Sequence, residues 1–96
     1  MYVSGRTVKS TVARPSTLAQ ATSATRAIAR HTVGTAGLTF ATTRGYDPER
    51  DRLYFATAVT FAEGTDVADF AALLGGSAGV YDVVVDPTRI TVYRHA

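Results

Sequence analysis

The stretch from Leu53 to Phe61 constrains the fold most strongly, because a mostly large apolar set of side chains alternates with a set of alanine, threonine and tyrosine along its whole length. A period of two residues places the two sets on opposite faces of a β-strand. The first set consists of Leu53, Phe55, Thr57, Val59 and Phe61. The other set consists of Tyr54, Ala56, Ala58 and Thr60. The pattern predicts a strand with one face on a core. A chain of 96 residues is long enough for a single domain, residues 1–96.

Four more strands and two helices are predicted from weaker patterns. Runs of β-branched and apolar residues predict strands at 6–13, 38–43, 81–85 and 90–94. Thr17 and Gln20 have the spacing of a helix capping box, and Gly34 supplies the stop of that helix. We expect Thr65 to cap a second helix that ends at residues 75–76.

The order of these elements is strand, helix, strand, strand, helix, strand, strand. It predicts an α+β fold of ferredoxin-like β-α-β-β-α-β topology with an extra C-terminal strand, in which two helices cover one face of a mostly antiparallel sheet. A polar loop at 45–50 and a turn at 86–88 are expected to close two hairpins. The expected core consists of Phe40, Leu53, Phe55, Val59, Phe61, Val67, Phe70 and Leu74, with several of Val80, Val83, Val85, Ile90 and Val92.

The composition argues against several classes of protein and site. Without cysteine the chain has no disulfide, thiolate metal site or cysteine nucleophile, which fits a reducing compartment. No apolar run approaches the roughly 20 residues that span a bilayer, and the N-terminal region holds no signal-peptide core. Residues 6–35 have the acid-free composition of an organellar transit peptide, although a folded helix is favoured there. We therefore expect a cytoplasmic protein with no membrane partner. Its Ala, Thr and Arg bias is typical of a GC-rich bacterial or phage genome.

Charge is divided unevenly along the chain. Residues 1–46 hold six basic residues and no acid, whereas residues 47–96 hold four arginines and eight carboxylates. This division predicts either a basic surface for an anionic partner or two halves that neutralise each other. The candidate residues for an anionic partner are Lys9, Arg14, Arg26 and Arg30. The charges are sparse and the aromatic motif of RNA-recognition domains is absent, so mutual neutralisation is favoured.

The polar run at 47–52 resembles the start of a calcium-binding loop, because its acids alternate. Arg52 stands where that loop needs glycine, and Ala58 stands where it needs a bidentate glutamate. The run is therefore interpreted as a metal-free polar turn.

No catalytic arrangement is visible in the sequence. His31 belongs to a helix end, His95 is the penultimate residue, and neither accompanies a recognisable nucleophile and orienting carboxylate. The glycine-rich runs at 34–37 and 75–79 match neither a dinucleotide fingerprint nor a phosphate loop. We expect no catalytic residue, no cofactor and no metal, with a small enzyme of unknown reaction as an alternative.

A sheet with helices on one side leaves its other face and its two edges without a partner. The open face is expected to carry the partner-binding residues Tyr54, Ala56, Ala58, Tyr81 and Tyr93. The sequence thus favours a small non-catalytic binding module that contacts another protein or associates with itself into an oligomer. A nucleic-acid-binding protein that uses the basic half is the main alternative.

Overall fold

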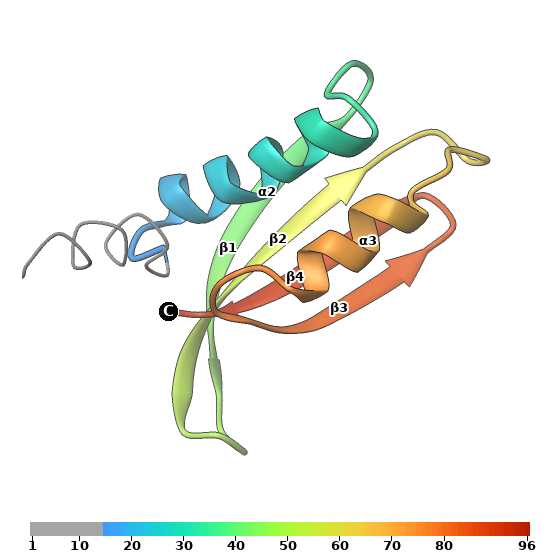
Figure 1. Ribbon diagram of the computed structural model, residues 1–96. Coiled ribbons are helices and arrows are strands. Elements are labelled where there is room, and N and C mark those ends of the chain that lie inside the picture. Colours follow the sequence, from blue (N-terminus) through green and yellow to red (C-terminus); the bar gives the residue numbers. More distant parts are fainter. Residues whose placement is uncertain (1–14) are drawn as a thin grey trace, which may run out of the picture.

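The computed structural model describes residues 15–96, and the strand expected at 6–13 lies outside them, as do Lys9 and Arg14. Residues 15–96 form an α+β fold of two helices and one four-stranded antiparallel sheet (Figure 1). The elements are α2 (Leu18–Thr32), β1 (Thr39–Asp47), β2 (Arg52–Thr60), α3 (Ala68–Gly75), β3 (Val80–Asp86) and β4 (Arg89–His95).

The strand order is β1-β2-β4-β3, so the ferredoxin-like order is not confirmed. That order would place the N-terminal strand between β2 and β3, and the extra strand β4 holds this position instead. Only Pro87 and Thr88 connect β3 to β4, which makes the two strands a hairpin. Ile90 and Val92 of β4 are fully buried, as expected for a strand with neighbours on both sides.

The boundaries of α2 follow the predicted signals. The Thr17 hydroxyl accepts a hydrogen bond from the backbone N–H of Gln20 at 3.1 Å. The Gln20 side chain accepts one in return from the backbone N–H of Ser16 at 2.7 Å, one residue before the N-cap, so the start of the helix is fixed from both sides. Gly34 follows the helix with φ of +79°, a conformation that glycine adopts without steric cost.

Two expectations about local structure were wrong. Thr65 does not cap α3: the N-cap is Val67, without a side-chain cap bond, and the carboxylate of Asp66 accepts from the N–H of Ala68 at 3.2 Å. The loop expected at 45–50 is also shorter, because β1 continues through Asp47 and pairs with β2 as far as Arg52. The long hairpin projects beyond the helices (Figure 1).

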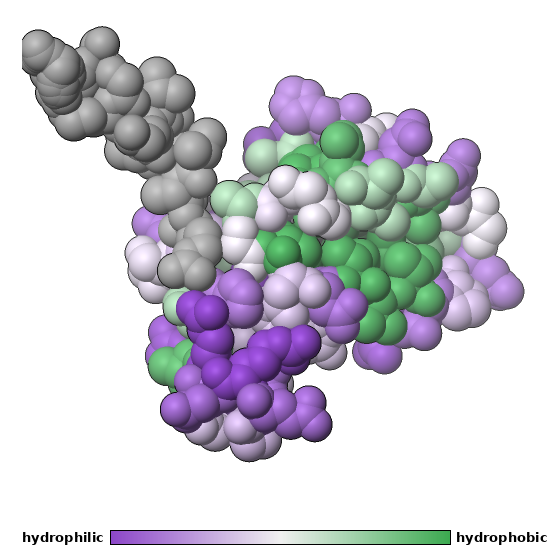
Figure 2. Space-filling view, turned by 60° about the horizontal axis from the view of Figure 1, so that its bottom comes forward, coloured by the Kyte–Doolittle hydropathy of each residue, from purple (hydrophilic) through white to green (hydrophobic). Residues whose placement is uncertain are grey.

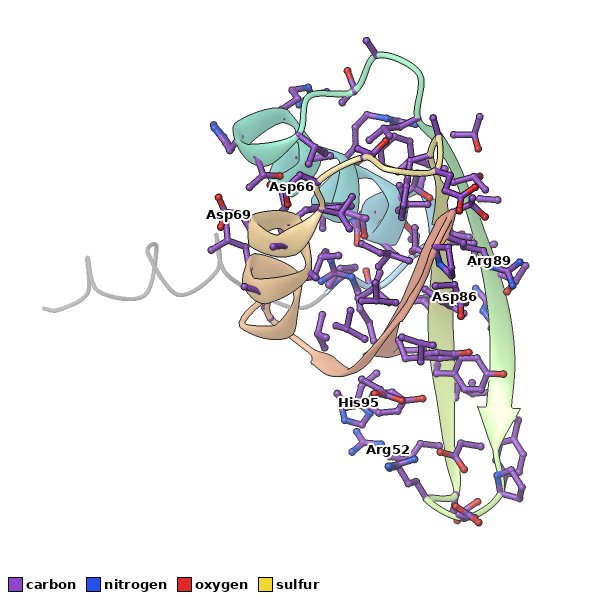
Figure 3. The ribbon with its side chains drawn as sticks, turned by 90° about the vertical axis from the view of Figure 1, so that its right-hand side faces the viewer. Arg52, Asp66, Asp69, Asp86, Arg89 and His95 are labelled. Carbon is purple, nitrogen blue, oxygen red and sulfur yellow. The ribbon has the colours of Figure 1, made fainter. Side chains whose placement is uncertain are left out.

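Both helices pack on one face of the sheet, where the core lies (Figure 3). The buried apolar side chains are Ala21, Ala29, Phe55, Val59, Phe61, Phe70, Leu74, Ile90 and Val92. Leu53, expected in the core, is 52% exposed; it is the second residue of β2 and pairs with Tyr46 near the hairpin turn, away from the buried part of the strand. Val85 is 53% exposed at the edge of the sheet.

A buried arginine links both helical regions to the sheet. Arg94 of β4 is 1% exposed, and its guanidinium donates to the Thr25 hydroxyl of α2 at 3.2 Å. It also donates to the Ser77 hydroxyl at 3.0 Å and to the Ala78 carbonyl at 3.2 Å, just after α3. Burial lowers the pKa of Arg94, and no carboxylate among residues 15–96 pairs with it. The negative end of the α3 dipole and the three hydrogen bonds offset part of this desolvation.

We expect Phe70→Ala to lower the free energy of unfolding by about 3–5 kcal/mol, since it removes a fully buried ring and leaves a cavity. Leu73→Ala on the same helix is the control, because Leu73 is 53% exposed and its loss should cost less than about 1 kcal/mol. Urea denaturation measures both values. Equal losses in the two variants would contradict this core.

We expect Arg94→Ala to lower the free energy of unfolding by about 2–5 kcal/mol, because three hydrogen bonds and buried packing are lost together. Arg89→Ala, an exposed arginine on the same strand, should stay within about 0.5 kcal/mol of wild type. Thermal and urea denaturation of both variants would detect the difference. An Arg94→Ala protein as stable as the Arg89→Ala protein would refute the linking role.

Candidate functional site: the open face of the sheet

The face of the sheet opposite the helices is uncovered by any part of residues 15–96 (Figure 3). The pairing register places the following central positions on it, and we call this set the open face. It consists of Ala41, Thr43, Gly45, Tyr54, Ala56, Ala58, Asp82, Val84, Thr91 and Tyr93. Alanine and threonine form its centre, so the sheet backbone there is covered only by short side chains.

The structure brings the five predicted partner-binding residues together on or beside this face. Tyr54, Ala56, Ala58 and Tyr93 occupy the two central strands, β2 and β4. Tyr81 lies in β3 at a register shift between Val80 and Asp82, and its ring reaches the same cluster.

The tyrosine rings contact one another. Tyr54 and Tyr93 meet edge to face with their ring centres 5.7 Å apart, and Tyr81 lies 6.2 Å from Tyr93. His95, placed at a frayed end by the sequence interpretation, stacks on Tyr81 at 4.5 Å. These contacts hold the rings in defined positions, and ring pairs of this kind each contribute about 0.5–1.5 kcal/mol beyond their buried area.

Gly45 positions the Tyr54 ring. The two residues are direct partners across β1 and β2, and a Cβ atom at position 45 would collide with the end of the ring. The absence of a side chain therefore allows Tyr54 to lie over the neighbouring strand. The sequence analysis placed Gly45 in a loop and therefore missed its contact with the Tyr54 ring. Only the pairing register of β1 and β2 would have shown that the two residues lie opposite each other.

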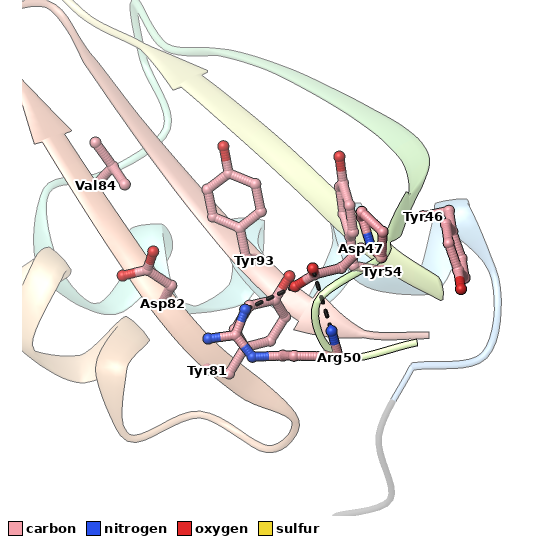
Figure 4. Close-up of a pocket in the computed structure, with 9 residues that line it drawn as sticks. Tyr46, Asp47, Arg50, Tyr54, Tyr81, Asp82, Val84 and Tyr93 are labelled. Atoms are coloured by element: carbon pink, nitrogen blue, oxygen red, sulfur yellow. Dashed lines mark hydrogen bonds and ion pairs between the residues drawn. The ribbon is translucent and has the colours of Figure 1, made fainter. Parts of the chain in front are cut away.

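A polar loop forms one end of the open face. Arg50, from the loop between β1 and β2, pairs with the Asp47 carboxylate at 2.6 Å, and its guanidinium lies 4.8 Å from the centre of the Tyr81 ring. Asp47 also accepts the backbone N–H of Glu49 at 3.0 Å. Beside this loop is a shallow hollow of about 360 Å³ (Figure 4). It is lined by Tyr46, Asp47, Pro48, Arg50, Tyr54, Tyr81, Asp82, Val84 and Tyr93.

Hydrogen bonds, burial and charge shift the pKa values of Asp47, Tyr81 and Tyr46. The hydrogen bond from Arg50 holds the pKa of Asp47 below its ordinary value, with help from backbone N–H groups. Burial raises the pKa of Tyr81, and the negative charge of Asp47 raises it further. The pKa of Tyr46 is raised by the hydrogen bond that its hydroxyl donates to Asp51.

The candidate residues for an anionic partner do not join this site. Arg26 and Arg30 belong to α2, on the other side of the sheet, and Arg26 lies 5.0 Å from the centre of the Phe40 ring. The expected pairing between the basic and acidic halves is absent from residues 15–96, where the ion pair is that of Asp47 with Arg50. The exposed charges at the hairpin tip form a strongly hydrophilic end of the molecule (Figure 2).

Within residues 15–96 no group of three His, Asp or Glu side chains is arranged to hold a metal ion. None of the helices described is long and apolar enough to cross a lipid bilayer. Comparison with protein-family models, with curated proteins and with solved structures found no match. The geometry of the open face is therefore the basis for a functional assignment.

We expect Asp47→Asn to lower the pKa of Tyr81 and of Tyr46, because the variant removes a negative charge that opposes ionisation of both. Their raised pKa values stabilise the fold below the unfolded tyrosine pKa of about 10, and this contribution is lost as the pH rises through the folded values. Ultraviolet titration should therefore show tyrosinate at lower pH in the variant. Asp69→Asn, on α3, should titrate as wild type. An unchanged titration of Asp47→Asn would contradict the charge coupling.

Proposed function

We propose that this protein is a small non-catalytic binding module, and that the open face is its contact surface for another protein or for a second copy of itself. The observation that carries the proposal is the gathering of Tyr54, Tyr81 and Tyr93 on a sheet face that residues 15–96 leave uncovered. Tyrosine is enriched at protein interfaces, where its ring supplies contact area and its hydroxyl supplies a hydrogen bond.

The shape of the face supports contact with a large partner. Small side chains at Ala56, Ala58 and Thr91 allow a second layer of backbone to approach closely, as in packed sheets about 10 Å apart. The tyrosines are already held by one another and by Gly45, so less side-chain entropy is lost on binding.

The polar loop supports specificity. Asp47 and Arg50 use part of their hydrogen-bonding capacity on each other. Both also border the hollow, where they can form hydrogen bonds with a partner. A cluster of aromatic anchors beside a charged rim is the arrangement that concentrates binding energy in a few residues.

Two features disfavour nucleic acid on this face. Asp47 and Asp82 place negative charge beside the tyrosines, which repels phosphates. The Tyr81 ring is already engaged by Arg50 and His95, so its surface is not free to stack on a base. Nucleic-acid binding through Arg26 and Arg30 remains the alternative, and an enzyme of unknown reaction is the second one.

The test places a photo-crosslinking amino acid at exposed Thr43 on the open face, and at exposed Ala72 on α3 as the control position. We expect protein adducts in living cells from position 43, and about tenfold fewer when Tyr93→Ala is added, because a loss of 1.4 kcal/mol reduces binding tenfold. Mass spectrometry identifies the adduct as another protein, a second copy or nucleic acid. Equal protein adducts from positions 43 and 72, or adducts with nucleic acid alone, would refute the proposal.

A further inference from the structure

β3 forms one edge of the sheet and pairs only with β4 among residues 15–96 (Figure 3). None of the backbone hydrogen bonds formed by loops and turns in this part of the chain reaches the segment from Tyr81 to Asp86. The outer side of β3 therefore offers peptide groups to another strand.

The hairpin register shows which peptide groups these are. Asp86 and Arg89 flank a two-residue connection and form the closing pair, so hydrogen-bonded pairs with β4 recur at Val84 and Asp82. The N–H and C=O groups of Val83 and Val85 consequently point away from β4, toward the free edge.

The side chains along this edge are unusually apolar. Val84 is 41% exposed on the open face, and Val85 is 53% exposed on the opposite face. A broad hydrophobic area lies on the half of the molecule that holds α3 and β3 (Figure 2). Edge strands are usually protected by lysine or proline, and the segment from Val83 to Val85 has neither.

Two acids select what can pair with this edge. Asp82 and Asp86 flank Val84 on the same side of the sheet, and neither forms an ion pair within residues 15–96. A second copy paired antiparallel about Val84 would place Asp82 opposite Asp86 twice, and like charges directly opposite are destabilising. A strand with basic residues at the two flanking positions would instead meet both carboxylates.

We propose that the outer edge of β3 binds an extended segment of another protein in which one basic residue stands two positions before and another two positions after a central residue, with apolar residues between them. The segment adds a fifth strand: its backbone pairs with Val83 and Val85, and its basic side chains pair with Asp82 and Asp86. Asp82 and Val84 also belong to the open face, but the pairing peptide groups of Val83 and Val85 lie on the free edge of β3, so the inference does not depend on the function proposed above.

The test titrates the full chain with the peptide Thr-Lys-Val-Thr-Val-Lys-Thr and, as a control, with the same peptide carrying Glu in place of Lys. Amide hydrogen exchange followed by NMR is the measurement. We expect exchange at Val83 and Val85 to slow at least about tenfold at saturating Lys peptide, with no change for the Glu peptide. Asp82→Asn with Asp86→Asn should abolish the preference for Lys.

Val85→Pro removes one outward N–H group without removing a bond to β4, a substitution that edge strands tolerate. Provided that its urea midpoint stays near that of wild type, we expect it to lose peptide binding. Continued binding by this variant would overturn the proposal.

A second variant applies if proline unfolds the protein. Val84→Glu adds a third negative charge to the same side of the edge as Asp82 and Asp86, so it should tighten binding of the Lys peptide. Unchanged or weaker binding overturns the proposal. Amides at Val83 and Val85 that are already protected in the free monomer, or a dimer that Val84→Glu dissociates, would also overturn it.

Discussion

The buried guanidinium of Arg94 is the interaction on which the arrangement of layers depends. It joins the central strand β4 to α2 through Thr25 and to the end of α3 through Ser77 and Ala78. A buried cation without a carboxylate is costly, and its two terminal nitrogens, although not Nε, donate to oxygen acceptors that only the assembled fold brings together. Arg94 thereby favours the arrangement in which both helices share one face of the sheet.

One-sided coverage has a direct consequence for function. With both helices on the core side, the tyrosines of β2, β3 and β4 gather on the opposite side, and the long β1–β2 hairpin carries Arg50 to the Tyr81 ring. The open face is consequently an ordered surface, with a shallow floor at its centre and an aromatic cluster bordered by charge at one end.

The uneven charge along the sequence has a different meaning in three dimensions. Arg26 and Arg44 of the basic half lie over the rings of Phe40 and Phe55 on the helix side, where arginine stems cover apolar surface. The acids Asp82 and Asp86 line an edge strand instead of neutralising those arginines. Charge along this chain thus reports local packing and edge chemistry more than a division into two complementary halves.

Local patterns in the sequence were sufficient to predict the start of α2 at Thr17, its end at Gly34 and the two faces of β2. They were also sufficient to place Tyr54 and Tyr93 on the side of their strands opposite the core. Each of these features depends on neighbours within a few residues. Long-range pairing decided the rest. β4 became a central strand because a short turn ties it to β3 and because Ile90, Val92 and Arg94 need cover from the helices. The position of the Tyr54 ring over Gly45 and the contact of Arg50 with Tyr81 depend on strand register. Register brings residues together across the sheet, and local periodicity does not reveal it.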